Sequence, residues 1–269
     1  MSYNITRHIQ YFASLLTLAT LPIATGYAKE QNNGFFIAGP ALSPEYQGSD
    51  DYGIVPMIVS QFNVANIDFE VEGLATRAAF YDKGPVRVGA TMEVDFGRDE
   101  EVENPIIAKF SEIDLAFNVG VYSAYELPNQ FLQDDNLELR LSIFSDVSGA
   151  HDGQYATFSA TYTLPLYIPW RFEFELETSY ANSSYMSTYF GVNELNSAQS
   201  GLPYYEASGS LRDVTLSANI GLFLNPTWGA FLRLGYKELL GDAKDSPIVI
   251  HGDSSQYFAG LGVFYRFGG

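Results

Sequence analysis

The chain has 269 residues, with 14 basic and 32 acidic side chains and a formal net charge of −18. This balance excludes nucleic acid as a partner, because affinity for phosphate depends on lysine and arginine. The chain contains no cysteine, which excludes disulfide bonds and thiolate metal sites. No sequence pattern indicates a cofactor.

The first segment has the pattern of a secretory signal peptide. Arg7 and His8 precede an apolar stretch from Tyr11 to Leu21, and the small residues Gly26 and Ala28 suit cleavage after Ala28. The apolar stretch is shorter than the roughly 20 residues that a membrane-spanning helix needs. We therefore expect a signal peptide at 1–28 and a single exported domain at 29–269.

The rest of the chain alternates between apolar and polar or small residues. In the segment 86–96, for example, Val86, Val88 and Ala90 alternate with Arg87, Gly89 and Thr91. A period of two indicates β-strands, whereas helical periodicity is weak except near 193–201. Similar alternation occurs at 67–73, 112–126, 137–145, 155–164, 171–180, 213–224, 228–238 and 257–267.

Three features favour a membrane barrel over a soluble one. The strands run to roughly ten residues, which suits a tilted membrane crossing. Short connections at 82–85, 167–170 and 225–227 alternate with long ones at 97–110, 181–211 and 240–254, as in outer-membrane barrels. The apolar faces also end in aromatic residues, which prefer the membrane interface: Tyr125, Tyr162, Trp170, Tyr180, Trp228, Tyr236, Tyr257 and Tyr265. The predicted fold is all-β, a transmembrane antiparallel up-and-down β-barrel in the outer membrane of a Gram-negative cell.

The strand count stays open between ten and twelve. Counting back from a periplasmic end at Phe267 places 63–66 outside the cell and makes 54–62 the first of ten strands. The segment 34–42 then has no crossing of its own and lines the lumen. Alternatively, 185–192 is an additional strand and the barrel has twelve.

Four stretches of the sequence resemble the MipA/OmpV family of outer-membrane proteins. They are PEYQGSDDYGIVP at 44–56, GRD at 97–99, YFGVNELNSAQSGLPYY at 189–205 and LLGDAKDSPIV at 239–249. The motif residues that we single out are Pro44, Tyr46, Gly48, Ser49, Asp50, Gly97, Arg98, Asp99, Tyr189, Phe190, Gly191, Val192, Ser200, Gly201, Leu202, Asp242, Ser246 and Pro247.

The resemblance implies an outer-membrane barrel without a known catalytic centre. It also implies a scaffold for periplasmic enzymes that remodel peptidoglycan, with a lytic transglycosylase and a murein synthase as partners beside the membrane lipids. From the topology, the partner surface would be the periplasmic connection at 127–136 together with the N-terminal residues that follow the cleavage site.

The alternation also predicts which charged residues face the lumen. Acidic residues outnumber basic ones there, which is compatible with a packed lumen held by ion pairs or with a narrow, porin-like, cation-preferring pore. The principal lumen candidates are Glu93, Asp95, Glu112, Asp114, Glu138, Arg140, Glu173, Glu175, Glu177, Arg233, Lys237 and Arg266, and the same faces carry Asp68, Glu70, Glu72, Arg87 and Arg171.

His151 and His251 fall in predicted loops near serine and aspartate residues, a composition compatible with a membrane hydrolase. No motif holds a nucleophile and a base together, so we expect no enzyme. Acidic clusters at 48–52, 97–101, 133–135 and 241–245 lack the spacing of a dedicated calcium loop, and no metal site is predicted.

Overall fold

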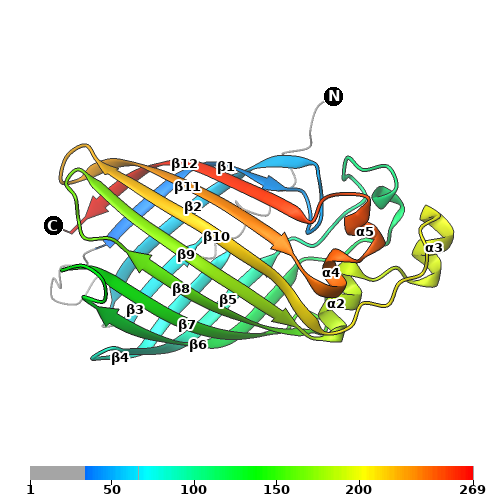
Figure 1. Cartoon of the computed structure of the whole chain (residues 1–269), viewed down its shortest axis with the longest axis horizontal. Coiled ribbons are helices and arrows are strands. Elements are labelled where there is room, and N and C mark those ends of the chain that lie inside the picture. The colour runs from blue at the N-terminus through cyan, green and yellow to red at the C-terminus, as the bar shows by residue number, and fades with distance from the viewer. Residues whose placement is uncertain (1–33, 66, 269) are drawn as a thin grey trace. The chain divides into compact units, whose positions relative to one another are not determined.

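A computed structural model describes residues 34–65 and 67–268. The predicted signal peptide lies outside the described residues, and so do positions 29–33. The described chain forms a closed barrel of twelve antiparallel strands, each paired with its neighbours in sequence (Figure 1). Closure is made by the last strand against the first, with Gly34 opposite Phe267 and Leu42 opposite Ala259.

The strands vary considerably in length. In chain order they are β1 (Gly34–Pro44), β2 (Tyr52–Val64), β3 (Ile67–Glu72), β4 (Ala75–Lys83), β5 (Val86–Asp95), β6 (Ala116–Pro128), β7 (Asn136–Asp146), β8 (Gln154–Thr163), β9 (Trp170–Ala181), β10 (Ser210–Phe223), β11 (Trp228–Leu239) and β12 (Ser255–Phe267). Most have 9 to 14 residues, but β3 has only 6.

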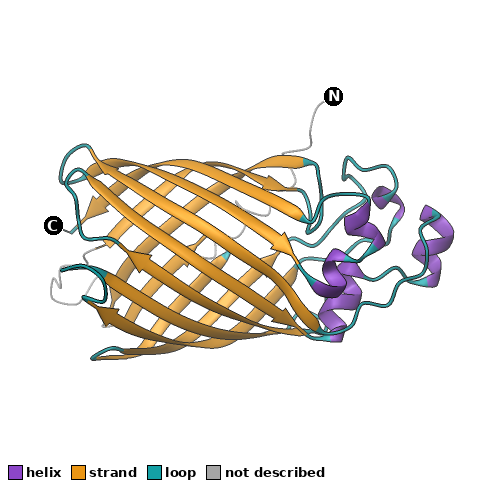
Figure 2. Ribbon diagram, in the orientation of Figure 1, coloured by secondary structure: helices purple, strands orange, loops and turns teal. Residues whose placement is uncertain are grey.

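The two ends of the barrel differ. Short connections and the C-terminal strand end lie at one end, which we call the turn end. Long connections lie at the other, the loop end, where the helices gather (Figure 2). The helical elements are η1 (Ile107–Lys109), α2 (Ser183–Phe190), α3 (Glu194–Ser200), α4 (Gly241–Lys244) and α5 (Pro247–Ile250).

The prediction of ten to twelve strands is confirmed, but two details of the strand count were wrong. The segment 34–42 belongs to a strand, β1, and β2 runs toward the turn end, so the connection after Val64 lies there and not outside. The missing crossing is β3, which reverses at Gly73 into β4. The segment 185–192 is not a strand, because most of it belongs to α2, where Asn182 caps the first turn by accepting from the Tyr185 N–H. The short helix expected near 193–201 is α3.

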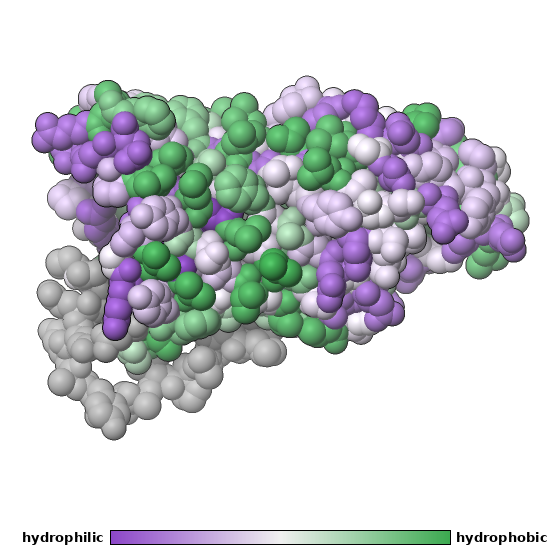
Figure 3. All heavy atoms as spheres, turned by 60° about the horizontal axis from the view of Figure 1, so that its bottom comes forward, coloured by the Kyte–Doolittle hydropathy of each residue, from purple (hydrophilic) through white to green (hydrophobic). Residues whose placement is uncertain are grey.

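Apolar side chains cover the outside of the barrel wall. On the face in Figure 3, hydrophobic residues lie over the middle of the strands and hydrophilic ones toward the ends. Aromatic residues at strand ends, such as Trp228, Tyr236 and Tyr257, are exposed on this outer surface. A closed barrel satisfies its backbone hydrogen bonds internally, and an apolar outer wall bounded by aromatic rings suits a lipid bilayer. The protein is therefore a barrel of the outer membrane.

No helix in the described part of the chain is long and apolar enough to cross a membrane.

Candidate functional site

The long connections of the loop end fold together into one structure, which we call the cap. It consists of residues 45–51, 96–115, 147–153, 182–209 and 240–254. Two hydrophobic clusters lie mainly within it. One centres on α2, whose Met186 and Phe190 are fully buried, and the other joins Tyr46, Ile107, Val192 and Ile248. The cap therefore has its own packed core and is more than a set of solvated loops.

The first two family motifs meet inside the cap. The Arg98 guanidinium lies over the rings of Tyr46 and Phe110, at 5.8 and 5.2 Å from their centroids. Arg98 is only 5% exposed, and its burial lowers its pKa to about 10. Gly97 has φ of +67°, and a β-carbon there would clash with the Ile113 carbonyl oxygen, so this turn requires glycine.

The third and fourth motifs are joined by hydrogen bonds. The buried Ser246 hydroxyl donates to the Phe190 carbonyl oxygen at 2.6 Å and accepts from the Ile248 N–H at 3.2 Å. The Tyr205 hydroxyl donates to the Asp242 carbonyl oxygen at 2.9 Å. Pro247 occupies the first turn of α5, where its missing N–H has no cost.

Most of the remaining motif residues also shape the cap. Gly201 ends α3 in a left-handed conformation, and the Ser200 hydroxyl accepts from the Leu202 N–H at 3.2 Å. Gly48, with φ of +95°, packs against Val249. Gln256 of β12 donates to the carbonyl oxygens of Tyr46 and Ser49. Asp50 and Asp99 are, in contrast, on the surface or near it. The residues on which the family resemblance rests thus lie mainly in the cap, with Pro44 at the end of β1.

A buried ionic cluster joins the cap to the barrel wall. Arg212 of β10 pairs with Asp213 and donates to the Tyr185 hydroxyl at 2.6 Å and to the Ser179 hydroxyl at 3.0 Å. The Ser179 hydroxyl in turn donates to Asp213, and Gln47 donates to the Tyr185 hydroxyl at 2.8 Å. The Arg212 guanidinium therefore connects three elements: β10, which carries it, β9 through Ser179 and α2 through Tyr185.

The sequence carries one signal of this cluster, the adjacent charged residues Arg212 and Asp213 at the start of a predicted strand. Arg212 and Asp213 are adjacent and both buried, which breaks the alternation expected of a strand. The break coincides with an irregularity in the pairing of β10 with β9 between Leu211 and Asp213. Such irregularities redirect side chains.

His151 and His251 are not arranged as catalytic bases. His151 is buried, with Nε2 at 2.9 Å from the Asn118 side-chain oxygen and Nδ1 accepting from the Gly153 N–H at 3.0 Å. His251 Nδ1 lies 2.9 Å from the Pro247 carbonyl oxygen. Among the described residues, neither ring is hydrogen-bonded to a serine hydroxyl.

Inside the barrel, an ion-pair network crosses the lumen. Arg140 of β7 reaches Glu70 of β3 at 3.2 Å, and Arg233 of β11 pairs with Glu72 of β3. In both pairs the two strands are not neighbours in the sheet, so these side chains must meet across the interior. Arg77 pairs with Glu70 and Glu72. Arg87 extends the network from Glu70 to Glu126 and Glu138.

The other predicted lumen residues divide into three groups. Glu173 accepts from Asn219 at 2.8 Å, and Glu175 accepts from the Thr161 hydroxyl at 3.0 Å. Glu173 also lies 3.9 Å from the Arg171 guanidinium. Among the described residues, Glu93, Glu177 and Lys237 form no ion pair within 4.0 Å, and Asp95 accepts from Gln47 at 3.3 Å. Glu112 and Asp114 differ from the prediction, because β6 begins only at Ala116 and both are exposed in the cap.

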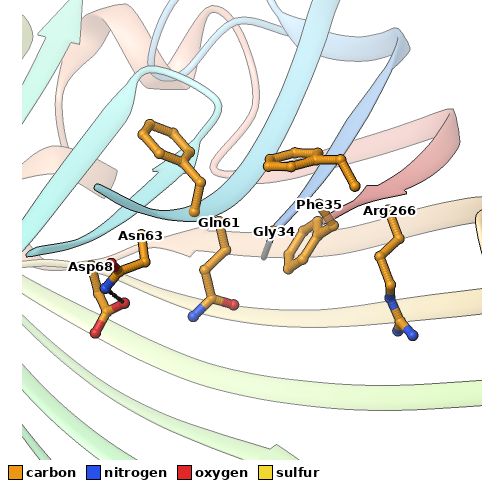
Figure 4. Close-up of a pocket in the computed structure, with 8 residues that line it drawn as sticks. Gly34, Phe35, Gln61, Asn63, Asp68 and Arg266 are labelled. Carbon is orange, nitrogen blue, oxygen red and sulfur yellow. Dashed lines mark hydrogen bonds between the residues drawn. The ribbon is translucent and has the colours of Figure 1, made fainter. Parts of the chain in front are cut away.

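A cavity of about 440 Å³ opens near the turn end, between β1, β2, β3 and β12. In Figure 4, Gln61, Asn63, Asp68 and Arg266 extend toward the same side of these strands. Asn63 donates to Asp68 at 2.8 Å, and the Arg266 guanidinium lies over the rings of Phe223 and Phe264. The prediction of Arg266 as a lumen residue is compatible with this position.

Among the described residues, no group of three histidine, aspartate or glutamate side chains is placed to hold a metal ion.

Fold and cap together define the class: a transmembrane β-barrel with a folded cap over one end. A family model described as MltA-interacting protein MipA matches residues 37–267, nearly the whole of the described chain. The chain therefore belongs to the MipA family. The search of curated proteins returned no match.

Solved outer-membrane barrels share the fold in outline only. The NanC porin is 10% identical, with a TM-score of 0.42 over 87% of this chain and 98% of the porin. The COG4313 outer membrane channel from Pseudomonas putida F1 is 9% identical, with a TM-score of 0.43 over 92% of this chain and 100% of that one. A bacterial polysaccharide outer membrane secretin is 10% identical, with a TM-score of 0.44 over 89% of this chain and 100% of that one.

Proposed function

We propose that the protein is a membrane platform that holds a periplasmic peptidoglycan-remodelling enzyme at the outer membrane. The observation that supports this most is the cap, whose packed core covers the loop end while the ion-pair network crosses the lumen below it. A general diffusion pore needs an open path through the loop end of the barrel and through the lumen below it. A platform needs only a stable barrel and an accessible periplasmic surface, and it needs no catalytic residue.

The turn end offers such a surface. Short turns of outer-membrane barrels face the periplasm. Phe131 is 73% exposed and Ile168 82% exposed, in the two adjacent turns that precede β7 and β9. The turn that precedes β7 is held in place by Asp135. The Asp135 carboxylate accepts from the N–H groups of Phe131 and Leu132 and from the Tyr162 hydroxyl. Exposed apolar side chains on a fixed turn are suited to protein contact.

The family description, MltA-interacting protein, points to a lytic transglycosylase as the partner. We extend the proposal to a murein synthase only as a second member of the same assembly.

Capture of partners from detergent-solubilised outer membrane tests the proposal. The triple variant Phe131→Ser, Leu132→Ser, Ile168→Ser should lose the murein enzymes that the unaltered protein retains, identified by mass spectrometry and by digestion of peptidoglycan. The matched control is Leu195→Ser with Ile250→Ser, which removes exposed apolar residues from the cap instead. Equal capture by the two variants, or no murein enzyme with the unaltered protein, would contradict the platform.

A cation-preferring channel is the second candidate. It is favoured by the row Glu173, Glu175 and Glu177 on β9, which carries little compensating positive charge. Rings of acidic side chains select cations. If the protein conducts, replacing all three by glutamine should reduce the cation preference, measured as the reversal potential under a KCl gradient. An unchanged preference would remove this row from the ion path.

A further inference from the structure

The barrel wall is incomplete on one side. β3 pairs with β2 only as far as Glu72, opposite Val59, and then reverses at Gly73. β2 continues toward the loop end from Ile58 to Tyr52, paired with β1 alone. A strand needs about 9–11 residues to cross the membrane, so the 6 residues of β3 end within the bilayer.

This leaves an unpaired strand edge on β2. The Ile58 carbonyl oxygen accepts from the Gly73 N–H at 2.8 Å, so the polar groups of Ile58 point toward β3. Those of Pro56 and Ile54 point the same way, because successive residues of a strand alternate. Within 34–65 and 67–268, no backbone partner reaches them on that side. Pro56 has no N–H to leave unpaired, which is why proline suits an edge.

Exposure along β2 is as expected for an open wall. Ile54, on the outer side, is 69% exposed. Val55 is paired with Ala41 of the lumen's apolar cluster and so faces inward, yet it is 37% exposed. The next inward residue, Met57, is 6% exposed. Backbone with unpaired groups is tolerated at membrane depth only where it is buried in protein or lines a water-filled cavity.

The lumen beside this edge is apolar. Ile37, Met57 and Phe231 form a buried cluster, with Val59 and Phe264 packed against it. These residues come from β1, β2, β11 and β12, whereas the ion-pair network occupies β3 to β7 and reaches β11 only at Arg233. Outside, the same edge is flanked by exposed apolar residues such as Leu42 and Ile54. Apolar side chains therefore lie on both the outer and the inner side of this edge.

We propose that this gap is a lateral portal, through which the acyl chain of an outer-leaflet amphiphile enters the apolar side of the lumen. The hydrocarbon of the leaflet lies against the gap, and the cluster inside offers the same chemistry. The head group stays at the membrane surface. The portal is independent of the platform, since it uses neither the turns nor the cap.

The absence of cysteine allows clean labelling. Single cysteines replace Val55 at the edge and Met57 in the lumen cluster, and each carries a small fluorophore. Ser217→Cys, inward on β10 and 3% exposed, is the shielded control, and Leu261→Cys, outward on β12, is the lipid-exposed one. Heat-modifiable gel migration checks that each labelled variant is folded.

The probe is lysophosphatidylcholine with a nitroxide on its acyl chain, added to vesicles that hold the full chain. We expect saturable quenching at Val55 and Met57 that unlabelled lysophosphatidylcholine reverses, no quenching at Ser217, and non-saturable quenching at Leu261. A two-chain nitroxide phospholipid should quench Val55 but not Met57, which distinguishes entry from lipid contact.

The proposal is overturned if Val55 and Met57 behave like Ser217. It is also overturned if Val55 is shielded at high protein density and becomes exposed on dilution, because the edge would then pair with a second copy. Val55→Trp, which fills the gap, should abolish quenching at Met57; unchanged quenching there would place the entry route elsewhere.

Discussion

Arg212 connects the cap, β9 and β10 through its guanidinium. Replacing it by methionine leaves Asp213, which is fully buried, without its cation. Breaking a buried pair in this way costs about 3–5 kcal/mol. We expect Arg212→Met to lower the free energy of unfolding by that amount, measured by denaturant titration of tryptophan fluorescence in detergent.

The control for Arg212 is Arg171→Met, because Arg171 is 55% exposed and meets Glu173 only at 3.9 Å. An exposed pair contributes about 0–1 kcal/mol. The double variant Arg212→Met, Asp213→Leu should recover much of the loss, since it removes both charges. Equal costs for Arg212→Met and Arg171→Met would contradict the assigned role.

His151 should make the cap sensitive to acid. Burial lowers the pKa of its imidazole, and Asp146, Asp95 and Asp152 oppose that shift while Arg212 adds to it. Because the folded protein prefers the neutral ring, the unfolded state binds more protons below about pH 6.5, and stability falls as pH decreases. Protonation would also remove the acceptor for the Gly153 N–H.

We therefore expect protease cleavage within 147–153 to increase as pH falls below about 6.5, the ordinary pKa of histidine. Glutamine keeps a neutral polar side chain, so His151→Gln should flatten that dependence. A pH profile shared by the two proteins would exclude His151 as the sensor.

At the scale of the element, the last strand shows how strictly its two faces are separated. Leu261 is exposed on the lipid side, and Leu261→Arg places a charge there. The cost should be about 2–4 kcal/mol if the residue lies near the middle of the bilayer. Leu261→Met should cost far less, and refolding yield with unfolding free energy measures both. Similar values for the two variants would show that this face does not contact lipid.

The neighbouring residue illustrates a limit of reading faces from alternation. Gly260 lies on the lumen side, where alternation alone suggests that a small polar side chain is tolerated. A β-carbon on Gly260 would overlap the Met57 sulfur, so this flexible side chain would have to shift. Gly260→Ser should therefore carry a modest steric cost that alternation does not reveal, smaller than the cost of Leu261→Arg.

At the scale of the whole molecule, we expect the cap to limit conduction through the barrel. Phe190 is fully buried in the cluster around α2, and Phe190→Asp would place a charge in that core. We expect the unaltered protein to be silent in planar bilayers and the variant to conduct, with the barrel itself still heat-modifiable on gels.

Leu195→Asp, on the exposed side of α3, is the matched control and should remain silent. Conductance by the unaltered protein at the same level as Phe190→Asp would show that the cap does not close the path, and it would favour the channel over the platform.

The sequence by itself determined the class of fold. Alternation with period two, aromatic residues at strand ends and unequal connections follow from a wall with lipid on one side, because each strand must present the same two faces. Family resemblance was likewise readable, since its motifs are local. The motif residues could be named from the sequence, but the cap that they build could not be predicted from it.

Only the tertiary structure decided the strand count, the cap and the partners of the charges. The alternation at 67–73 ends at this turn, but no pattern identified 75–83 as a second strand, so β3 and β4 were counted as one crossing. Arg233 and Glu72 are 161 residues apart and meet because closure of the barrel brings β11 opposite β3. Alternation specifies which face a side chain occupies, whereas register and closure specify what it meets there, and these depend on every strand at once.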